Sequence, residues 1–207
     1  AQLWRRRLLA EGGQEALART LAVLGPVSLV ALLATLVTMR ADVTAGPLSS
    51  IELDLEDNMT VTAVTSGGSA TTFSRPARLL QVDLDRAYGT GEEVELVVSY
   101  HGDPTGDSFA WDTFGGKSMV WTLSEPFGAR SWWPCKDYPE DKADSVDVRI
   151  TAPTTMVPVS NGRLRSSTDN GATAFAWWHE DHPISTYLVS LAVHPYTLTT
   201  DWYHAGP

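Results

Sequence analysis

The residues that could do chemistry lie together in one stretch of the sequence, residues 122–150. Charged or nucleophilic side chains recur there at short spacing: Glu125, Arg130, Cys135, Asp137 and Lys142. Glu125 is followed by Pro126, which stiffens the backbone directly after the carboxylate. A carboxylate held in this way could accept a hydrogen bond from a cationic ligand, or it could pair locally with Arg130.

The other members of the stretch each have two interpretations. Cys135 could be a nucleophile if a histidine base lay beside it, or it could be a small buried residue. Arg130, Asp137 and Lys142 could form a charged site. They could instead form a network that holds an irregular segment together, because charges beside a pair of tryptophans would need partners if they were buried. We expect the structural interpretation for both sets.

The stretch follows the pattern T-x-x-E-P-x-x-A-R-x-x-x-P-C-x-D-x-P-x-x-K-A. In this pattern it resembles the central motif of the N-terminal domain of zinc aminopeptidases, the family of aminopeptidase N, the endoplasmic-reticulum aminopeptidases and leukotriene hydrolase. The resemblance implies that Glu125 contacts the free amine of a peptide substrate. It implies that the other motif residues are structural, namely Arg130, Pro134, Cys135, Asp137 and Lys142. It also implies a zinc ion in the full-length parent, none in this chain, and a downstream catalytic domain as partner.

The role implied for Glu125 makes chemical sense. An exopeptidase must distinguish a chain end from a chain interior, and the end is marked by an ammonium group with three donors. A fixed carboxylate accepts one of these donors in a charge-assisted hydrogen bond worth about 1.5–3 kcal/mol. It also sets the register of the peptide against the reacting centre. We further expect the Glu125–Pro126 peptide bond to be cis, since proline lowers the cost of that isomer.

The sequence H-E-D-H at residues 179–182 invites a zinc interpretation. The metallopeptidase motif H-E-x-x-H places its histidines at i and i+4, so that both face one metal ion. Here the spacing is i and i+3, and Pro183 disfavours a helix at this point. We therefore predict a solvated hairpin. The sequence contains neither H-E-x-x-H nor the family's G-x-M-E-N loop, so we assign no catalytic residue and no tight zinc site to residues 37–207.

From residue 37 onward, apolar residues recur with a period of two, which is typical of strands with one buried face. The clearest runs lie at residues 51–55, 80–84, 94–100, 146–150 and 187–193. The pairs Asn161-Gly162 and Asn170-Gly171 favour hairpin turns. Many short strands at regular spacing predict an all-β fold, an antiparallel β-sandwich, over residues 37–207. The resemblance implies the extended β-saddle form of that fold.

Residues 1–36 are predicted to form an apolar extension outside the sandwich core, as a helix or as loosely attached chain. No charged residue occurs in residues 20–39, a run about as long as a membrane-spanning helix. The basic residues just before it also suit a secretory signal, although Gly25-Pro26 would kink a helix. A membrane or signal anchor, a buried element and a foreign extension all remain open. An anchor or signal within residues 5–39 would make the protein membrane-anchored or secreted; otherwise we expect a cytoplasmic protein.

Composition excludes some partners. The net charge is −10 and the sequence has no basic stripe, so we expect no nucleic-acid partner. The single cysteine excludes an internal disulfide and a cysteine-based zinc site. The tryptophans could form a ligand-stacking surface. Adjacent tryptophans on a strand point to opposite faces, however, so we expect core and inter-domain packing instead.

Two functions remain open on the sequence alone. The first is the N-terminal β-domain of a zinc aminopeptidase-like protein, which packs on the catalytic domain and helps bind the amino terminus of a peptide. Such a domain would not be catalytic alone. The alternative is a non-catalytic binding or scaffold module, with membrane contact through residues 20–39. An H-E-x-x-H motif in the downstream reading frame would favour the first.

Overall fold

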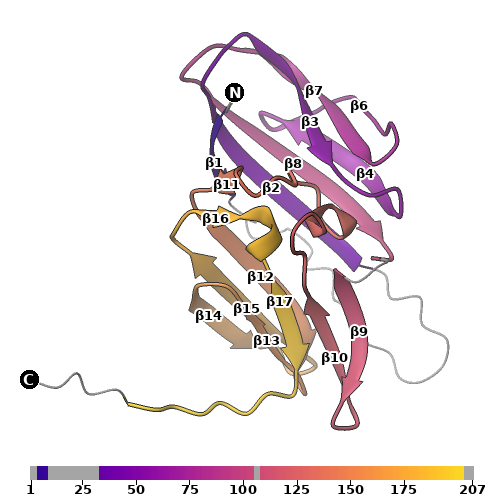
Figure 1. Cartoon of the computed structure of the whole chain (residues 1–207), viewed down its shortest axis with the longest axis vertical. Helices are drawn as coiled ribbons and strands as arrows, with labels where there is room; N and C mark the ends of the chain where they lie inside the picture. The colour runs from indigo at the N-terminus through magenta and orange to yellow at the C-terminus, as the bar shows by residue number, and fades with distance from the viewer. Residues whose placement is uncertain (1–3, 9–32, 105–107, 203–207) are drawn as a thin grey trace, which may run out of the picture.

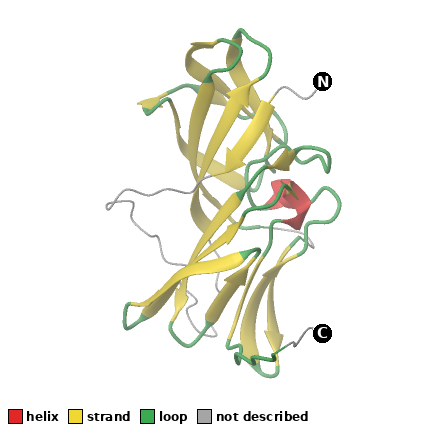
Figure 2. Cartoon of the chain, turned by 90° about the vertical axis from the view of Figure 1, so that its left-hand side faces the viewer, coloured by secondary structure: helices red, strands yellow, loops and turns green. Residues whose placement is uncertain are grey.

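The computed structural model describes residues 4–8, 33–104 and 108–202 of the 207-residue chain. An eight-stranded sheet runs the length of the molecule, with smaller sheets beside its upper and lower parts (Figures 1 and 2). In spatial order its strands are β14 (Arg163–Asp169), β15 (Thr173–Glu180), β12 (Val146–Pro153), β1 (Trp4–Leu8), β2 (Leu33–Val43), β8 (Glu93–Gly102), β4 (Met59–Ser66) and β5 (Ser69–Ala70).

Three smaller sheets complete the fold. Their strands, in spatial order, are β13 (Val157–Ser160), β17 (Leu191–His194), β10 (Lys117–Thr122) and β9 (Phe109–Phe114); β3 (Leu48–Asp54), β7 (Leu79–Tyr88) and β6 (Phe73–Ser74); and β11 (Lys142–Ala143) with β16 (Ile184–Ser185). Within the described ranges, helix is limited to two single 3₁₀ turns, η1 (Ala129–Ser131) and η2 (Thr186–Leu188). Figure 2 shows helix, in red, only near the middle of the molecule. The predicted all-β, largely antiparallel fold is confirmed.

The alternation in the sequence explains where the core lies. Along β8 every second side chain is buried, from Val94 to Tyr100, and the side chains between them are more exposed. Along β7 the buried positions are Leu80, Val82, Leu84 and Tyr88. Burying an aliphatic side chain of this size contributes about 1.5–3 kcal/mol, so the period of two directly selects the faces that pack together.

The chain before residue 37 differs from the prediction in two described segments. β1 lies within the eight-stranded sheet, antiparallel to β2 and joined to β12 by a parallel pairing of Leu8 with Val146. β2 begins at Leu33, so the proposed boundary between residues 36 and 37 falls inside a strand. A helix or loose chain is therefore wrong for both segments, because pairing with distant strands overrides the local pattern. The membrane contact was predicted for residues 20–39, and most of that segment, residues 20–32, lies outside the described residues.

No helix among the described residues has the length and apolarity needed to cross a bilayer.

The two predicted hairpin turns differ in outcome. Asn170-Gly171 joins β14 to β15 in a hairpin, as predicted. Asn161-Gly162 joins β13 to β14, which belong to different sheets, so it forms no hairpin. A Cβ on Gly162 would overlap the carbonyl of His179, so the close approach of the two backbone segments requires a glycine here. The strand predicted at residues 187–193 is replaced by η2 followed by β17.

Candidate functional site

Glu125 lies on a short loop between β10 and η1, and its side chain is exposed. The loop is closed at its base, where the Gly128 amide donates to the Ser124 carbonyl over 2.8 Å. The amide of Leu123 donates to the Ser108 carbonyl over 3.0 Å. The Glu125–Pro126 peptide bond is cis, as predicted. The structure thus presents a carboxylate to solvent from a loop whose two ends are hydrogen-bonded.

The residue before Glu125 is anchored through its side chain as well. Ser124 is only 2% exposed, and its hydroxyl accepts a 2.9 Å hydrogen bond from the indole Nε1 of Trp132. Trp132 is itself buried, and its carbonyl accepts a 2.9 Å hydrogen bond from the Tyr100 hydroxyl. Its ring packs 6.1 Å, centroid to centroid, from the ring of Phe109. Sequence reasoning missed Ser124, because no local pattern marks a serine as the partner of a tryptophan eight residues away.

Arg130 is committed to two carboxylates other than Glu125. Its Nε lies 2.8 Å from Asp137 Oδ2, and one terminal nitrogen lies 3.1 Å from Asp54 Oδ1. Asp54 Oδ2 accepts a 2.9 Å hydrogen bond from the Asp137 amide, which closes the group. Among the described residues, no hydrogen bond or ion pair engages the Glu125 carboxylate. The local pairing of Glu125 with Arg130, which the sequence left open, does not form in this structure.

The network of Arg130, Asp54 and Asp137 is largely buried, so its charges interact strongly with one another. Asp137 is fully buried, and the Arg130 side chain is 19% exposed. Burial works to lower the pKa of Arg130, but the hydrogen bond to Asp137 and the charges of Asp54 and Asp137 outweigh it and raise the pKa. Buried ions of this kind persist only with partners, so the structural interpretation of Arg130 and Asp137 is the one that the geometry favours. Asp54, from β3, was missed by sequence reasoning.

Pro134 and Cys135 continue the same buried segment. The backbone of Cys135 forms an isolated antiparallel bridge with Asp54, with hydrogen bonds of 2.7 and 3.2 Å in the two directions. Its side chain is 2% exposed, and Pro134 is buried too. The bridge therefore attaches the motif to β3, and a buried position suits the small side chain of Cys135 better than nucleophilic chemistry.

Lys142 corrects the predicted network. It lies in β11, paired with Ser185 of β16, and its side chain is exposed. No ion pair in the described part of the chain joins it to Asp54 or Asp137. The place of the third member is taken by Asp54, which comes from a strand far away in the sequence.

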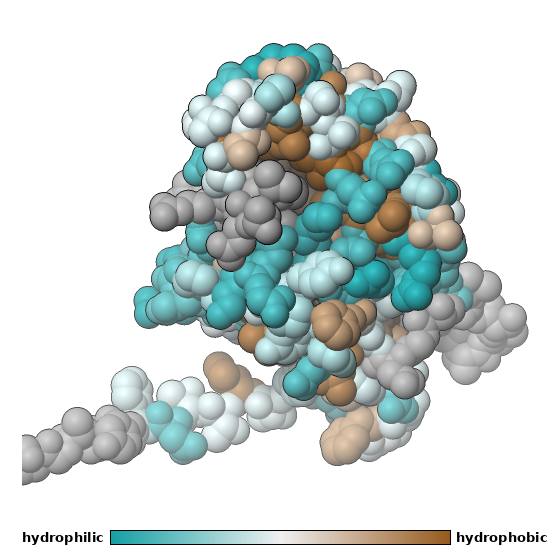
Figure 3. Space-filling view, turned by 45° about the horizontal axis from the view of Figure 1, so that its top comes forward, coloured by the Kyte–Doolittle hydropathy of each residue, from teal (hydrophilic) through white to brown (hydrophobic). Residues whose placement is uncertain are grey.

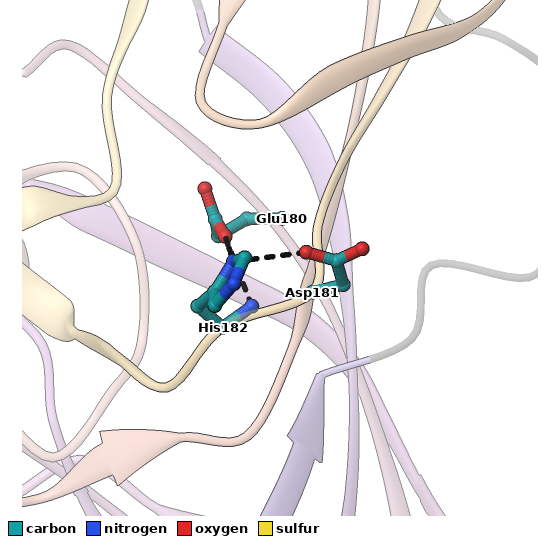
Figure 4. Close-up of side chains that lie close together, drawn as sticks. All are labelled: Glu180, Asp181 and His182. Carbon is teal, nitrogen blue, oxygen red and sulfur yellow. Dashed lines mark hydrogen bonds and ion pairs between the residues drawn. The ribbon is translucent and has the colours of Figure 1, made fainter.

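The H-E-D-H segment does not form a metallopeptidase-like zinc site. His179 and His182 point to different partners: the ring of His179 lies 2.8 Å from Asp147 Oδ1, whereas His182 lies within 3.0 Å of carboxylate oxygens of Glu180 and Asp181 (Figure 4). Glu180, Asp181 and His182 are the one group of potential metal ligands that the described residues bring together. They offer a single histidine on an exposed turn, and hydrogen bonds from the His182 amide and ring lower the pKa of Glu180. These residues do not fit a catalytic zinc, which normally has several nitrogen ligands.

The paired tryptophans pack rather than form a stacking platform. Trp132 and Trp133 are both buried. Trp177 donates to Asp147 over 2.6 Å, and Trp178 donates to the Pro158 carbonyl over 3.2 Å, so the indole nitrogens of this pair are used inside the molecule.

Residues 34–188 match the family described as the peptidase M1 N-terminal domain. This match covers well over half of the chain and includes the whole motif around Glu125. The chain belongs to this family. The resemblance to the N-terminal domain of zinc aminopeptidases is thereby confirmed.

Solved structures agree with the assignment. An M1 zinc metallopeptidase from Deinococcus radiodurans matches the M1 N-terminal domain with a TM-score of 0.70 and 28% identity, over 79% of this chain and 38% of that chain. Native yeast LTA4 hydrolase matches with a TM-score of 0.66 and 22% identity, over 79% and 26% of the two chains, and shows the fold alone. Aminopeptidase M1 of Arabidopsis thaliana is 35% identical over 77 residues, which are 37% of this chain and 9% of that protein. This chain therefore spans less than half the length of these relatives.

Proposed function

We propose that this M1 N-terminal domain packs on a downstream catalytic domain and that Glu125 binds the free amino terminus of a peptide substrate. One observation carries the proposal. Glu125 is an exposed carboxylate on an anchored loop, and Arg130, the arginine of the same motif, is already held by Asp54 and Asp137. The carboxylate thus remains available for a cation that comes from outside the domain.

The ligands named for relatives support an ammonium as that cation. The M1 zinc metallopeptidase of Deinococcus radiodurans was solved with Tyr-Ser-Ala, and a two-domain M1 zinc metallopeptidase was solved with L-tryptophan and with L-arginine. These ligands differ in length and side chain, and they share an α-ammonium group. A charge-assisted hydrogen bond from that group to Glu125 would recognise the end of the chain whatever side chain follows.

The reaction we propose for the parent protein is removal of amino-terminal residues from peptides. Zinc belongs to its catalytic domain, since the described residues here do not fit a catalytic zinc. The contribution of this chain is binding and orientation. A carboxylate that holds the first residue fixes which peptide bond can reach the reacting centre, and correct positioning of this kind accounts for several kcal/mol of a catalytic barrier.

Apolar surface around the loop supports packing on another domain. Leu123, Phe127 and Tyr138 are 59%, 53% and 59% exposed, and the rings of the last two meet edge to face, 6.5 Å apart. Figure 3 shows further exposed apolar side chains, surrounded by hydrophilic ones, in the upper part of one face of the molecule. Exposed apolar groups that gather at one place mark interaction surfaces, so the surroundings of Glu125 suit contact with the catalytic domain.

The test uses the full-length protein and two substrates, an aminoacyl reporter with a free amine and the same reporter with an acetylated amine. Glu125→Gln and Glu125→Ala should raise KM for the free-amine reporter roughly 10- to 150-fold, the equivalent of one charge-assisted hydrogen bond. The preference over the acetylated reporter should shrink accordingly. Glu93→Gln, at an exposed position of β8, is the matched control and should behave as wild type. Unchanged KM in both Glu125 variants would refute the proposal.

A further inference from the structure

We propose that Ser124 and Trp132 are positioning residues for Glu125, and that the hydrogen bond between the Trp132 indole and the Ser124 hydroxyl sets where the carboxylate stands. This inference rests on the proposed function, and it names how the domain fixes its amine-binding group.

The first step of the argument is the way in which Ser124 is held. Its carbonyl accepts from the Gly128 amide over 2.8 Å, and its hydroxyl accepts from Trp132 Nε1 over 2.9 Å. Its backbone is therefore bound to the far end of the loop, and its side chain is bound to a buried tryptophan. Glu125 follows directly, so no other residue separates it from this anchored point.

The second step is that Trp132 cannot easily turn. Its ring packs against the rings of Phe109 and Trp133, at centroid distances of 6.1 and 5.8 Å. Its carbonyl is bound by the hydroxyl of the buried Tyr100. An indole N–H packed in this way has a fixed direction, and it can serve as a rigid reference for the loop.

The third step concerns the far end of the loop. The hydroxyl of Ser131 donates to the Gly128 carbonyl over 2.7 Å. A Cβ on Gly128 would overlap the side chain of Ser108, so any larger residue here would require Ser108 to move. With Ser124 and Gly128 both fixed, residues 125–127 alone span the exposed tip, and Glu125 has little room to shift. Displacement of a binding group by about 1 Å can cost about 100-fold in rate.

The experiment is done in the full-length protein with the free-amine reporter. Ser124→Ala removes the acceptor, and Trp132→Phe removes the donor but keeps an aromatic ring. Each should raise KM about 3- to 10-fold with kcat nearly unchanged, and the double variant should be no worse than either single variant, because each breaks the same bond. In a Glu125→Ala background, neither change should alter KM, since the group that they position is gone.

Controls separate positioning from general stability. Trp178→Phe removes an equivalent indole donor, which bonds the Pro158 carbonyl, and Ser160→Ala removes a hydroxyl bonded to the Ser190 carbonyl. Both should leave KM unchanged. If Trp132→Phe does not fold, Ser124→Ala decides the question alone, since it deletes one oxygen atom.

The outcomes are distinct. A raised KM in Glu125→Ala with an unchanged KM in Ser124→Ala overturns this inference and leaves the proposed function standing. An unchanged KM in Glu125→Ala overturns both. Changes in KM that persist in the Glu125→Ala background would show that Ser124 and Trp132 act on the fold in general, and would also overturn the inference.

Discussion

The guanidinium of Arg130 and the carboxylate of Asp137 lie 2.8 Å apart, and Asp137 is fully buried. Asp54 joins them from β3, so a single cation is shared by two acidic side chains. The network links β3 to the motif that carries Glu125. We therefore expect its loss to lower the stability of the fold rather than to weaken substrate binding specifically.

Arg130→Met should lower the free energy of unfolding by about 3–5 kcal/mol, because it leaves two carboxylates without their cation in a buried place. Urea denaturation at neutral pH measures this. Arg78→Met is the control, since Arg78 pairs with Glu56 at a side chain that is 62% exposed, and such pairs contribute about 1 kcal/mol or less. Equal effects of the two substitutions would contradict the importance given to the buried network.

Tyr100 predicts how stability depends on alkaline pH. Burial raises the pKa of Tyr100 well above its usual range, so the folded state keeps the phenolic proton that the unfolded state loses near pH 10. The stabilisation is complete below that pH and falls as the pH rises toward the pKa of the folded state. Between pH 9 and pH 11 the loss should be about 1.4 kcal/mol.

Tyr100→Phe should remove this part of the pH dependence. At pH 7 the variant should be less stable by about 1 kcal/mol, because the hydrogen bond to the Trp132 carbonyl is gone. Unfolding measured at several pH values compares it with Tyr138→Phe, a change at an exposed tyrosine. If wild type and Tyr100→Phe lose stability in parallel above pH 9, the assignment to Tyr100 is wrong.

Gly128→Ala should destabilise the loop by about 1–3 kcal/mol, since the new methyl group meets the Ser108 side chain. Ser108→Gly makes room for it. The double variant should therefore recover much of the lost stability in a thermal unfolding measurement. If Ser108→Gly gives no recovery, then Ser108 is not the source of the restriction.

Zinc should not be retained by the turn at residues 180–182. After loading with zinc and dialysis, a fragment of residues 1–207 should hold no more metal than its His182→Ala variant, as measured by atomic emission. Stoichiometric zinc that depends on His182 would show that the exposed cluster binds metal despite its single histidine.

The sequence predicted those features that depend on neighbouring residues. The strands around Leu80–Leu84 and Val94–Tyr100 follow from an alternation that one short window contains. The cis bond at Glu125–Pro126 likewise depends on two neighbouring residues.

Features built by distant residues could not be predicted in this way. Alternation along β3 predicts an exposed residue at position 54. Asp54 is buried instead, because it pairs with Arg130, which is distant in the sequence. Lys142 carries a charge that could have joined the network, but it lies in the β11–β16 strand pair instead. Strand β1 was hidden because three consecutive arginines give no alternation, and its pairing with β2 and β12 comes from elsewhere in the chain.

The burial of Cys135 gives the domain a natural reporter. It is the only cysteine of the sequence, and it sits where the motif joins β3. A thiol reagent can reach it only when that junction opens, so the rate of labelling at increasing reagent concentration reads out local opening without any introduced dye or residue. Comparing that rate with global unfolding would show whether the loop that presents Glu125 comes apart before the sheets do.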